Sequence, residues 1–361
     1  MILTGGDPAP WFTVRSATRP DFHFGTIAGR YAVLSFIGSA GHPAAPALLE
    51  GLRAGPFDND FAALFLVSSD PEDEAQNRVT ESQGVYVFWD DDGAVARTYG
   101  VLREDKDRRQ VELVSFVLDP MLRILKVLPV RDPAGHGREI ADYLRTLPRR
   151  GPGPAPALLL PRIFEPDFCR QLIGLYEQGA SSDSGFMRTA PDTGLTILVK
   201  DHKFKRRRDV TIEDEEVRQQ IQARLRRRLV PEIRKAFQFH ASRIERYLVA
   251  CYEPQDGSGF RPHRDNTTKG TAHRRFAVTI NLNAEEYDGG DLVFPEFGTT
   301  PWRAPTGGAV VFSCSLLHEA LPVTKGARFC FLPFLYDDAA AKIRTENSRF
   351  LDLPDETPER P

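Results

Sequence analysis

The sequence contains little cysteine, and the first 168 of its 361 residues contain none. The cysteines that it does have form no Cys-x-x-Cys pair and lie at positions 169, 251, 314 and 330. So low a count excludes a fold that is held together by disulfides, as small secreted domains are. Free thiols at this frequency indicate a reducing compartment.

Long apolar runs and a strong net charge are also missing. The longest apolar stretches have the length of strands and fall well short of the roughly 20 residues of a membrane helix. The first residues, MILTGGDPAPWF, lack the basic segment and apolar run of a signal peptide. Lys and Arg number 47 against 50 Asp and Glu, so the net charge is −3 and no overall field attracts nucleic acid or an anionic membrane. We therefore expect a cytoplasmic protein that binds no membrane and has little tendency to bind nucleic acid.

Composition and chain length predict two globular domains. The apolar fraction of 41% and the charged fraction of 27% are ordinary values for folded proteins. Proline and glycine alternate around position 152, and such a segment cannot continue a helix or a sheet. We place one domain at residues 1–149, a linker at 150–157, a second domain at 158–345 and a polar tail at 346–361.

The first half alternates strands and helices. Continuous apolar runs such as YAVLSFI and FAALFLVS are typical of strands that are buried on both faces. This alternation predicts an α/β fold. Strands are expected at residues 31–37, 61–68, 85–89 and 114–118, and helices at 43–54 and 135–147.

The second half begins with helices and continues as short strands. One helix is expected to start near Pro166, because proline is favoured in the first helical turn. A capping pattern at residues 211–214 predicts a second helix, which Pro231 must kink or restart. The apolar stripe of that helix, at i, i+4 spacing, is Val217, Ile221, Leu225 and Leu229. The short apolar runs that follow predict an all-β sandwich or barrel, with strands at 247–252, 276–282, 291–294, 309–313 and 328–336.

Three side chains of the second half form a candidate metal site. His263 and Asp265 are alternate residues of an expected strand, so they project from the same face. His318 follows the apolar run at 309–312 and can supply a third ligand from a distant strand. Two histidines and one carboxylate on one side of a metal leave other positions open, which is typical of non-haem Fe(II) oxygenases.

Arg328 is a candidate for binding a carboxylate. It follows His318 along the chain, at the start of the next apolar run, FCFL. A guanidinium inside a barrel is costly unless it meets a carboxylate, and its planar fork suits two parallel hydrogen bonds to one. A dicarboxylate that chelates iron at one end and contacts Arg328 at the other fits this layout.

The region from about residue 161 to 336 resembles the Fe(II)- and 2-oxoglutarate-dependent dioxygenases, in particular the prolyl-4-hydroxylase-like branch. The family's His-x-Asp…His…Arg/Lys series is similar to the metal residues and Arg328 described above, and its Gly-Gly-Asp/Glu-Leu-x-Phe-Pro turn is similar to residues 289–295. The resemblance implies a double-stranded β-helix, or jelly roll, with flanking helices. It also implies that Tyr252 bonds the carboxylate of the co-substrate.

The same resemblance implies the cofactors and the reaction. Fe(II), 2-oxoglutarate and O2 would be used, with ascorbate as a candidate reductant, and succinate and CO2 would be released as a C–H bond is hydroxylated. Asp265 favours hydroxylation over halogenation, because halogenases of this superfamily carry a small residue there. Prolyl-4-hydroxylases commonly carry lysine where Arg328 stands, so this residue does not by itself imply a prolyl substrate.

Other polar residues of this half are weaker candidates. Thr279, with Asn281 on the same strand face, is a candidate to line the co-substrate site. Glu319 is equally compatible with a role beside the metal and with exposure, and His273 is expected in solvent or a loop. The basic run at 203–208 is interpreted as a solvated face, or as a lid that contacts an anionic substrate.

The first half resembles the peroxiredoxins, which have a thioredoxin-like fold. The resemblance is carried by GDPAPWF near residue 6, by YAVLSF at 31–36 and by DDGAVARTYGV at 91–101. In active peroxiredoxins a cysteine opens the helix after the strand that corresponds to 31–37, where the helix N-terminus lowers the thiol pKa. The matching region, 38–46, has no cysteine, so thiol peroxidase chemistry is excluded. We expect a scaffolding, docking or homodimerisation role, with recruitment of a protein substrate as the alternative.

The leading hypothesis is a 2-oxoglutarate-dependent hydroxylase that acts on a protein side chain, prolyl among the candidates, or on an amino-acid-like small molecule. Two alternatives stay open: a non-catalytic scaffold with a vestigial iron site, and a nucleic-acid demethylase. The retained metal ligands and Arg328 argue against the first, and the near-neutral charge argues against the second. The substrate is not identified, and the segments at 200–214 and 253–259 are the candidates to form its pocket.

Overall fold

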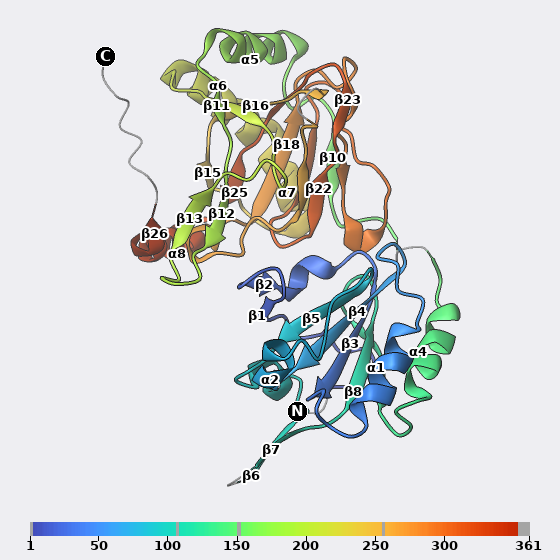
Figure 1. Cartoon of the computed structure of the whole chain (residues 1–361). Coiled ribbons are helices and arrows are strands. Elements are labelled where there is room, and N and C mark those ends of the chain that lie inside the picture. The colour runs from blue at the N-terminus through green and yellow to red at the C-terminus, as the bar shows by residue number, and fades with distance from the viewer. Residues whose placement is uncertain (1–2, 106–107, 150–152, 255–256, 353–361) are drawn as a thin grey trace. The chain divides into compact units, whose positions relative to one another are not determined.

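The computed structural model describes residues 3–105, 108–149, 153–254 and 257–352 (Figure 1). The chain divides into two compact units. The first is Met1–Gly153 with Pro295–Gly298, and the second is Pro154–Phe294 with Thr299–Pro361. Within the described residues, no helix is long and apolar enough to cross a membrane.

A mixed sheet forms the centre of the first unit (Figure 1). Its strands are β1 (Thr13–Ser16), β2 (Phe22–His23), β3 (Tyr31–Gly38), β4 (Ala62–Ser68), β5 (Val85–Trp89), β8 (Val114–Leu118) and β9 (Ile124–Pro129), in the order β2-β1-β5-β4-β3-β8-β9. The neighbours β3, β4 and β5 run parallel, and β8 pairs with β3 in the antiparallel direction. β3 and β4 are buried almost throughout, because their residues are apolar on both faces.

Both faces of this sheet are covered by apolar side chains. One face packs on helices α1 (Ala45–Arg53) and α4 (His136–Arg145), whose leucines share a core with β3, β4 and β5. The other face carries packed aromatic rings, with the ring centres of Phe65 and Phe88 5.3 Å apart. The predicted α/β thioredoxin-like fold is confirmed. The remaining elements are α2 (Pro71–Ala75), α3 (Ala94–Thr98) and a hairpin of β6 (Leu102–Asp105) and β7 (Arg108–Val111).

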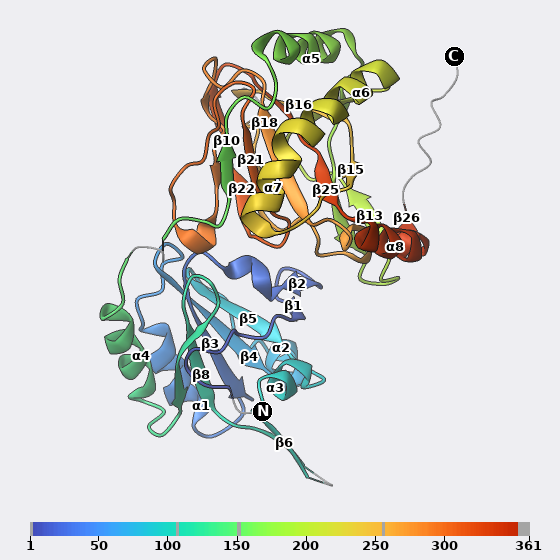
Figure 2. The ribbon, with the colours of Figure 1, turned by 180° about the vertical axis from the view of Figure 1, so that it is seen from behind.

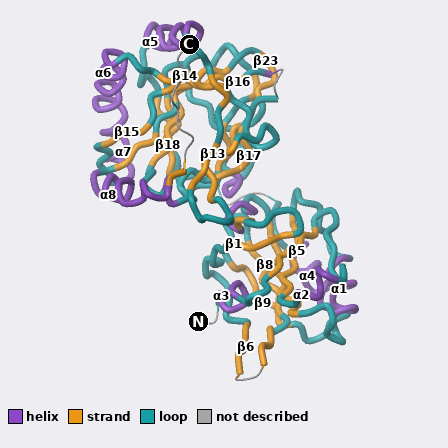
Figure 3. The backbone as a smooth tube through the Cα atoms, turned by 60° about the vertical axis from the view of Figure 1, so that its left-hand side comes forward, coloured by secondary structure: helices purple, strands orange, loops and turns teal. Residues whose placement is uncertain are grey.

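The second unit consists mainly of antiparallel sheets, whose strands are orange in Figure 3. The larger sheet contains β10 (Leu158–Leu160), β21 (Ala309–Ser313), β18 (Phe276–Asn281), β24 (Arg328–Phe331), β16 (Leu248–Tyr252), β14 (Arg208–Thr211) and β11 (Ser182–Asp183), in this order, and β25 (Phe334–Tyr336) links β15 (Arg243–Glu245) to β18. A smaller sheet has the order β17 (Phe260–His263), β22 (His318–Ala320), β20 (Leu292–Val293). Together they form the predicted double-stranded β-helix. Two smaller sheets lie outside them. One is the pair β19 (Asp288–Gly289) with β23 (Val323–Lys325), and the other has the order β12 (Phe186–Thr189), β13 (Thr196–Val199), β26 (Leu351–Asp352).

Helices cover the outer face of the larger sheet (Figure 2). α5 (Pro166–Gln178) begins at the predicted proline. α6 (Glu215–Arg224) passes through a π-helical turn, η2 (Leu225–Leu229), into α7 (Val230–Phe237), whose first turn contains Pro231. The restart expected at this proline is therefore confirmed. The predicted apolar stripe is buried in one core with Val249, Ile280 and Phe331 of the sheet.

One sequence prediction about this unit is confirmed and one is wrong. The helix expected after the capping pattern at 211–214 is α6, and its cap is Asp214, whose carboxylate accepts hydrogen bonds from the backbone N–H groups of Glu216 and Val217. The polar tail does not begin at residue 346. α8 (Asp338–Asn347) is followed by β26 (Leu351–Asp352), which pairs in parallel with β13, and the rest of the predicted tail lies outside the described residues.

Candidate metal centre and co-substrate site

The two histidines of the predicted metal site lie on neighbouring strands, β17 and β22. These strands pair so that His263 lies directly opposite His318, and the two ring centres are 4.2 Å apart. Directly opposite residues of an antiparallel pair project to the same face. Asp265 lies in a turn just after β17, and not within the strand as we predicted. Its backbone N–H donates to the carbonyl of Cys314, which fixes the turn beside the rings.

Backbone hydrogen bonds orient both imidazole rings. Nδ1 of His263 donates to the carbonyl of Arg261 at 2.7 Å. Nδ1 of His318 donates to the carbonyl of Leu316 at 3.0 Å. Each ring therefore presents Nε2 to the carboxylate of Asp265, at 3.6 Å for His263 and 3.4 Å for His318. Such a bond fixes the tautomer and orientation of a metal-binding histidine.

The charge states of these side chains suit a divalent metal. Burial acts to raise the pKa of the Asp265 carboxyl, but His318 and His263 outweigh burial and hold that pKa below its usual range. Burial, with His263 as a second cause, lowers the pKa of His318 to about 4. An ionised carboxylate and a neutral imidazole are the forms in which these groups bind metals.

The donor set fits a ferrous ion. One ligand atom from each of the three residues lies within 4.8 Å of the others. Two nitrogen donors and one oxygen donor on one side of an ion form the facial arrangement of non-haem Fe(II) sites. The side chains of His263 and Asp265 are 13% and 11% exposed, so the open side of the group is not sealed.

Arg328, on β24, is buried without a counter-ion. It is 3% exposed, and within the described residues its Nε and Nη1 have no hydrogen-bond partner. Tyr252 lies directly opposite on β16, and its ring centre is 5.0 Å from the guanidinium. A buried charge with free donors is strongly unfavourable unless an anion meets it. The pair therefore fits the distal carboxylate of a dicarboxylate.

The Gly-Gly turn makes room for Arg328. Gly290 has φ +67°, and a Cβ there would lie 3.0 Å from Cδ of Arg328, so only glycine meets both demands. Arg303, which we did not single out from the sequence, holds the turn. Its guanidinium donates to the carbonyl of Gly289 and to the carboxylate of Asp291, each at 2.5 Å.

The basic run at 203–208 is not the solvated face that we predicted. Lys205 and Arg207 are 3% and 4% exposed. Lys203 and Arg208 are exposed. Successive residues of an extended segment point to opposite sides, so Lys205 and Arg207 share one side, and Lys205 bridges to Phe260 at the start of β17. The interior side of the run thus carries two charges that the sequence pattern does not separate from their exposed neighbours.

Arg207 connects this segment to the co-substrate site. Its guanidinium donates to both carboxylate oxygens of Asp209, at 2.7 and 2.6 Å, and to the hydroxyl of Tyr252 at 3.4 Å. It also donates to Ser184 at 3.0 Å. Burial acts to lower the pKa of Arg207, but Asp209 outweighs burial and keeps it charged. The pair with Asp209 neutralises this charge and orients the Tyr252 ring.

Lys205 connects the same segment to the metal ligands. Its Nζ donates to Oγ of Ser184 at 2.8 Å and to the carbonyl of Gly185 at 2.5 Å. It also lies 5.0 Å from the ring centre of Phe260. That ring stacks on His263 with the centres 3.4 Å apart. Burial, and then Arg207, lower the pKa of Lys205 well below its usual value.

Thr279 lies on the face of β18 that carries the co-substrate residues. Asn281 is directly opposite Cys330 of β24, and residues 279 and 281 share a face, as do Arg328 and Cys330. Asn281 donates to the carbonyl of Ala304 at 2.7 Å, while its Oδ1 has no partner within the described residues. Both side chains are buried and remain candidates to line the site.

The structure also places His273 and Glu319, for which the sequence allowed only general expectations. His273 lies in a turn but is buried, at 2% exposed, because it shares the carboxylate of Glu245 with Arg274, at 2.7 and 2.6 Å. Arg274 in turn donates to the backbone carbonyl of Asp265 at 3.4 Å. Glu319 is half-buried, and burial raises its pKa.

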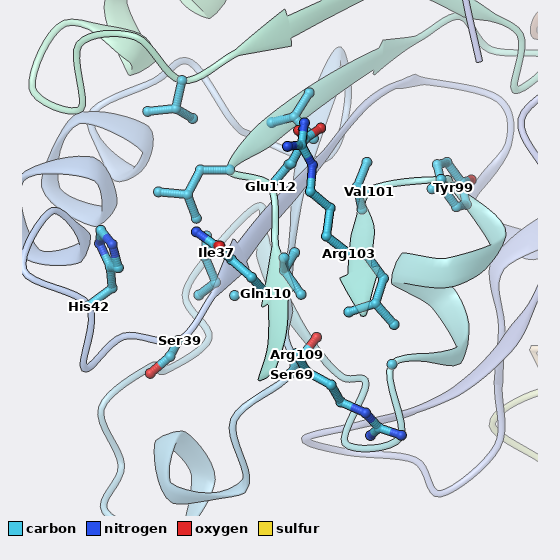
Figure 4. Close-up of a pocket in the computed structure, with 18 of the residues that line it drawn as sticks. Ile37, Ser39, His42, Ser69, Tyr99, Val101, Arg103, Arg109, Gln110 and Glu112 are labelled. Carbon is cyan, nitrogen blue, oxygen red and sulfur yellow. The ribbon is translucent and has the colours of Figure 1, made fainter. Parts of the chain in front are cut away.

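The first unit contains a pocket of about 950 Å³ at the C-terminal end of β3 (Figure 4). Ile37, Ser39 and His42 line one part of it, and Arg103 and Arg109 of the β6–β7 hairpin line another. This is the region in which peroxiredoxins are expected to carry their cysteine, and no cysteine is present in this half of the chain.

Comparison with protein families finds one match in each domain. Residues 5–127 match the AhpC/TSA family, and residues 247–336 match the 2OG-Fe(II) oxygenase superfamily. The chain therefore carries an N-terminal peroxiredoxin-like domain and a C-terminal 2OG-Fe(II) oxygenase domain with its His-x-Asp…His triad. The oxygenase domain is similar to PKHD-type hydroxylases.

A PKHD-type hydroxylase of Maricaulis maris is 35% identical over 108 residues, which are 27% of this chain and 48% of the relative. The PKHD-type hydroxylase PiuC of Pseudomonas aeruginosa is 33% identical over 90 residues, which are 23% of this chain and 39% of the relative. The chain thus spans less than half the length of these curated relatives.

Solved structures show weaker likeness to each half. A Trichoplax adhaerens prolyl hydroxylase in complex with a hypoxia-inducible-factor peptide is 18% identical, with a TM-score of 0.42, over 53% of this chain and 87% of that one. The peroxidoxin BcpB of Mycobacterium tuberculosis is 20% identical, with a TM-score of 0.34, over 40% of this chain and 99% of that one.

Proposed function

We propose that the chain is an Fe(II)- and 2-oxoglutarate-dependent hydroxylase, which oxidises a C–H bond of a protein side chain or of an amino-acid-like small molecule and releases succinate and CO2. The observation that carries the proposal is the pairing of two features in one domain. The triad of His263, Asp265 and His318 offers a facial metal site. Arg328 offers buried, unpartnered donors for a carboxylate.

Each residue has a defined task in this reaction. His263, Asp265 and His318 would hold the iron, and their backbone hydrogen bonds keep Nε2 aimed at it. Arg328 would bind the distal carboxylate of 2-oxoglutarate, with Tyr252 beside it. The bound iron, with 2-oxoglutarate and O2, supplies the oxidising power for C–H hydroxylation. The β-helix supplies orientation and the exclusion of water, and ascorbate is proposed as an auxiliary reductant.

The test is isotope incorporation. The full chain, Fe(II), 2-oxoglutarate and cell extract are incubated under 18O2, and succinate and oxidised products are followed by mass spectrometry. We expect succinate to form and one 18O atom to appear in a product. The His318→Ala chain should give neither. Equal succinate from the wild-type and His318→Ala chains would contradict the proposal.

Two other functions predict different results. A scaffold with a vestigial iron site binds no 2-oxoglutarate. A nucleic-acid demethylase binds DNA or RNA with an affinity that falls steeply as salt rises. The net charge of the chain is −3, so no overall field favours a polyanion.

The N-terminal domain is proposed to act without thiol chemistry. Scaffolding, docking or homodimerisation suits a domain that keeps its buried sheet but has no cysteine. We also propose a cytoplasmic location, in keeping with buried thiols that form no disulfide.

A further inference from the structure

Of the two buried charged groups of the basic run, Lys205 and Arg207, the proposed reaction leaves Lys205 without a use. Its ammonium has three N–H donors, and within the described residues they meet only the hydroxyl of Ser184 and the carbonyl of Gly185. Both of these acceptors are neutral. A buried charge without an opposite charge is strongly unfavourable.

No carboxylate of the described residues forms an ion pair with Lys205, although the charges of Asp209 and Asp265 act to raise its pKa. Arg207 is neutralised by Asp209. Arg328 is matched by the distal carboxylate of 2-oxoglutarate under the proposed function. A bound Fe(II) would be balanced by Asp265 and by a carboxylate of the co-substrate under the proposed function. Arg246 adds to the positive potential at Lys205 rather than relieving it.

The position of Lys205 relates it to the reacting centre. The ring of Phe260 is stacked on His263 and lies beside Nζ of Lys205. The Phe260 ring thus lies against both the ammonium of Lys205 and the ring of His263. Phe204 and Phe186 extend the apolar surface around Phe260, with ring centres 5.6 and 6.3 Å from it.

We infer that Lys205 binds a carboxylate of the molecule that is hydroxylated, while the aromatic rings around Phe260 contact the apolar part of that molecule. This inference rests on the proposed function and names the substrate class: an acceptor in which a carboxylate lies a few bonds from the C–H group that reacts. Lys205 is thus a specificity residue of the acceptor site and not a ligand of the co-substrate. Burial disfavours the free ammonium, and an arriving carboxylate restores it.

The test uses trifluoroacetate as a carboxylate probe and trifluoroacetamide as its neutral twin. The full chain is loaded anaerobically with Fe(II) and 2-oxoglutarate, so that Arg328 is occupied, and 19F relaxation of the probe is recorded. The Zn(II)-loaded chain gives the diamagnetic background. We expect saturable, Fe(II)-dependent broadening of trifluoroacetate and none of the amide.

The variants then assign the site. Lys205→Met should weaken trifluoroacetate binding at least tenfold while leaving the 2-oxoglutarate dissociation constant within twofold of wild type. Lys203→Met, in the exposed part of the same run, should behave as wild type. Lys205→Arg keeps a positive charge and should retain part of the trifluoroacetate binding. This variant still tests the inference if Lys205→Met does not fold. Two competitors then compare kinds of carboxylate by how well they displace trifluoroacetate. N-acetylproline carries a free terminal acid, and blocked acetyl-Asp-Pro-amide carries only an acidic side chain.

Equal broadening in the wild-type and Lys205→Met chains would overturn the inference. So would no broadening in the wild-type chain, or a loss of 2-oxoglutarate binding in Lys205→Met. Failure of the proposed function looks different, because then 2-oxoglutarate itself does not bind to the Fe(II)-loaded wild-type chain.

Discussion

At the scale of single residues, the site is defined by buried charges and by what each one meets. Asp265 meets two imidazoles, and Arg207 meets Asp209. Arg328 lies beside the neutral rings of Tyr252 and Tyr287, and its Nε and Nη1 are unpartnered within the described residues. A buried charge of this kind is tolerated where a ligand supplies the opposite charge. Removal of Arg328 should therefore lower the affinity for the co-substrate more than it lowers the stability of the fold.

Replacement of Arg328 by Met should therefore raise the dissociation constant for 2-oxoglutarate by about 100-fold or more, because truncating one member of a buried charge pair costs about 2–5 kcal/mol. Arg328→Lys should retain part of the affinity, since it keeps the charge but not the planar fork. Anaerobic equilibrium binding to the Fe(II)-loaded chain measures both. Arg243→Met, at an exposed ion pair of the same unit, is the control. Unchanged affinity in Arg328→Met would place the co-substrate elsewhere.

Two glycines of the same domain should respond in opposite directions to alanine. Gly290→Ala forces a left-handed conformation and a contact with Cδ of Arg328, so it should destabilise the chain by about 1–3 kcal/mol. Gly174 lies inside α5, and a Cβ there meets only Nε2 of Gln178, at 3.8 Å. Gly174→Ala should stabilise by about 0.5–1 kcal/mol. Urea unfolding compares them, and the same sign for both would contradict the packing described here.

Local patterns in the sequence could predict the metal site but not its surroundings. His-x-Asp, a later His and a later Arg carry their spacing in the sequence, so all four residues were named in advance. Lys205 and Arg207 were not separated from Lys203 and Arg208, because which side of the run is buried depends on pairing with a segment more than fifty residues away. Tertiary pairing of this kind leaves no local signal.

At the scale of elements, two strand pairs and one helix position the chemistry. β17 and β22 set the histidines opposite each other, and β16 and β24 set Tyr252 opposite Arg328. The helix α6 is held to the start of α5 by Glu165, whose carboxylate accepts from Arg224 at 2.7 Å and from Arg228. Both arginines thus form ion pairs that join the two helical segments.

The ion pairs of Glu165 predict a pH dependence of stability. Hydrogen bonds from Arg228 and Arg224 lower the pKa of Glu165 to about 2 from the usual 4.5. A lowered pKa stabilises the fold above the unfolded-state value, and that contribution is lost as the pH falls from about 4.5 toward 2. Glu165→Gln should have a lower melting temperature than wild type at pH 7, and the difference should shrink below about pH 4.5. A difference independent of pH would contradict the pairing.

The spacing of apolar residues predicts strand and helix positions, because side chains become buried at regular intervals along an element. The stripe from Val217 to Leu229 was predicted in full, since its i, i+4 spacing survives the π-helical turn. The end of the chain was misjudged because a polar helix and a two-residue strand have little apolar pattern. β26 is held by pairing with β13, which no neighbouring residue indicates.

At the scale of the whole molecule, a thioredoxin-like domain without cysteine accompanies an oxygenase domain. All four cysteines lie in the second half, and all are buried. Burial raises the pKa of Cys169 to about 12 and also raises the pKa values of Cys314 and Cys330. The chain therefore has no accessible thiolate for peroxide chemistry.

Thiol titration tests this absence of reactivity. We expect the native chain to react with Ellman's reagent much more slowly than the urea-unfolded chain, which should expose all four thiols. Thiol-dependent consumption of hydrogen peroxide should stay at the level of the buffer. A rapidly reacting native thiol, or peroxidase turnover, would show that a cysteine of the C-terminal domain is reactive, and would contradict this account.

The central claim is that one iron site and one carboxylate site act together in the C-terminal domain. Its most direct test is anaerobic titration of the full chain with Fe(II) and 2-oxoglutarate, followed by visible absorption. We predict a charge-transfer band that needs both components, disappears in His318→Ala, and in Arg328→Met requires a far higher 2-oxoglutarate concentration. A wild-type chain that binds Fe(II) but shows no band at any 2-oxoglutarate concentration would contradict the account.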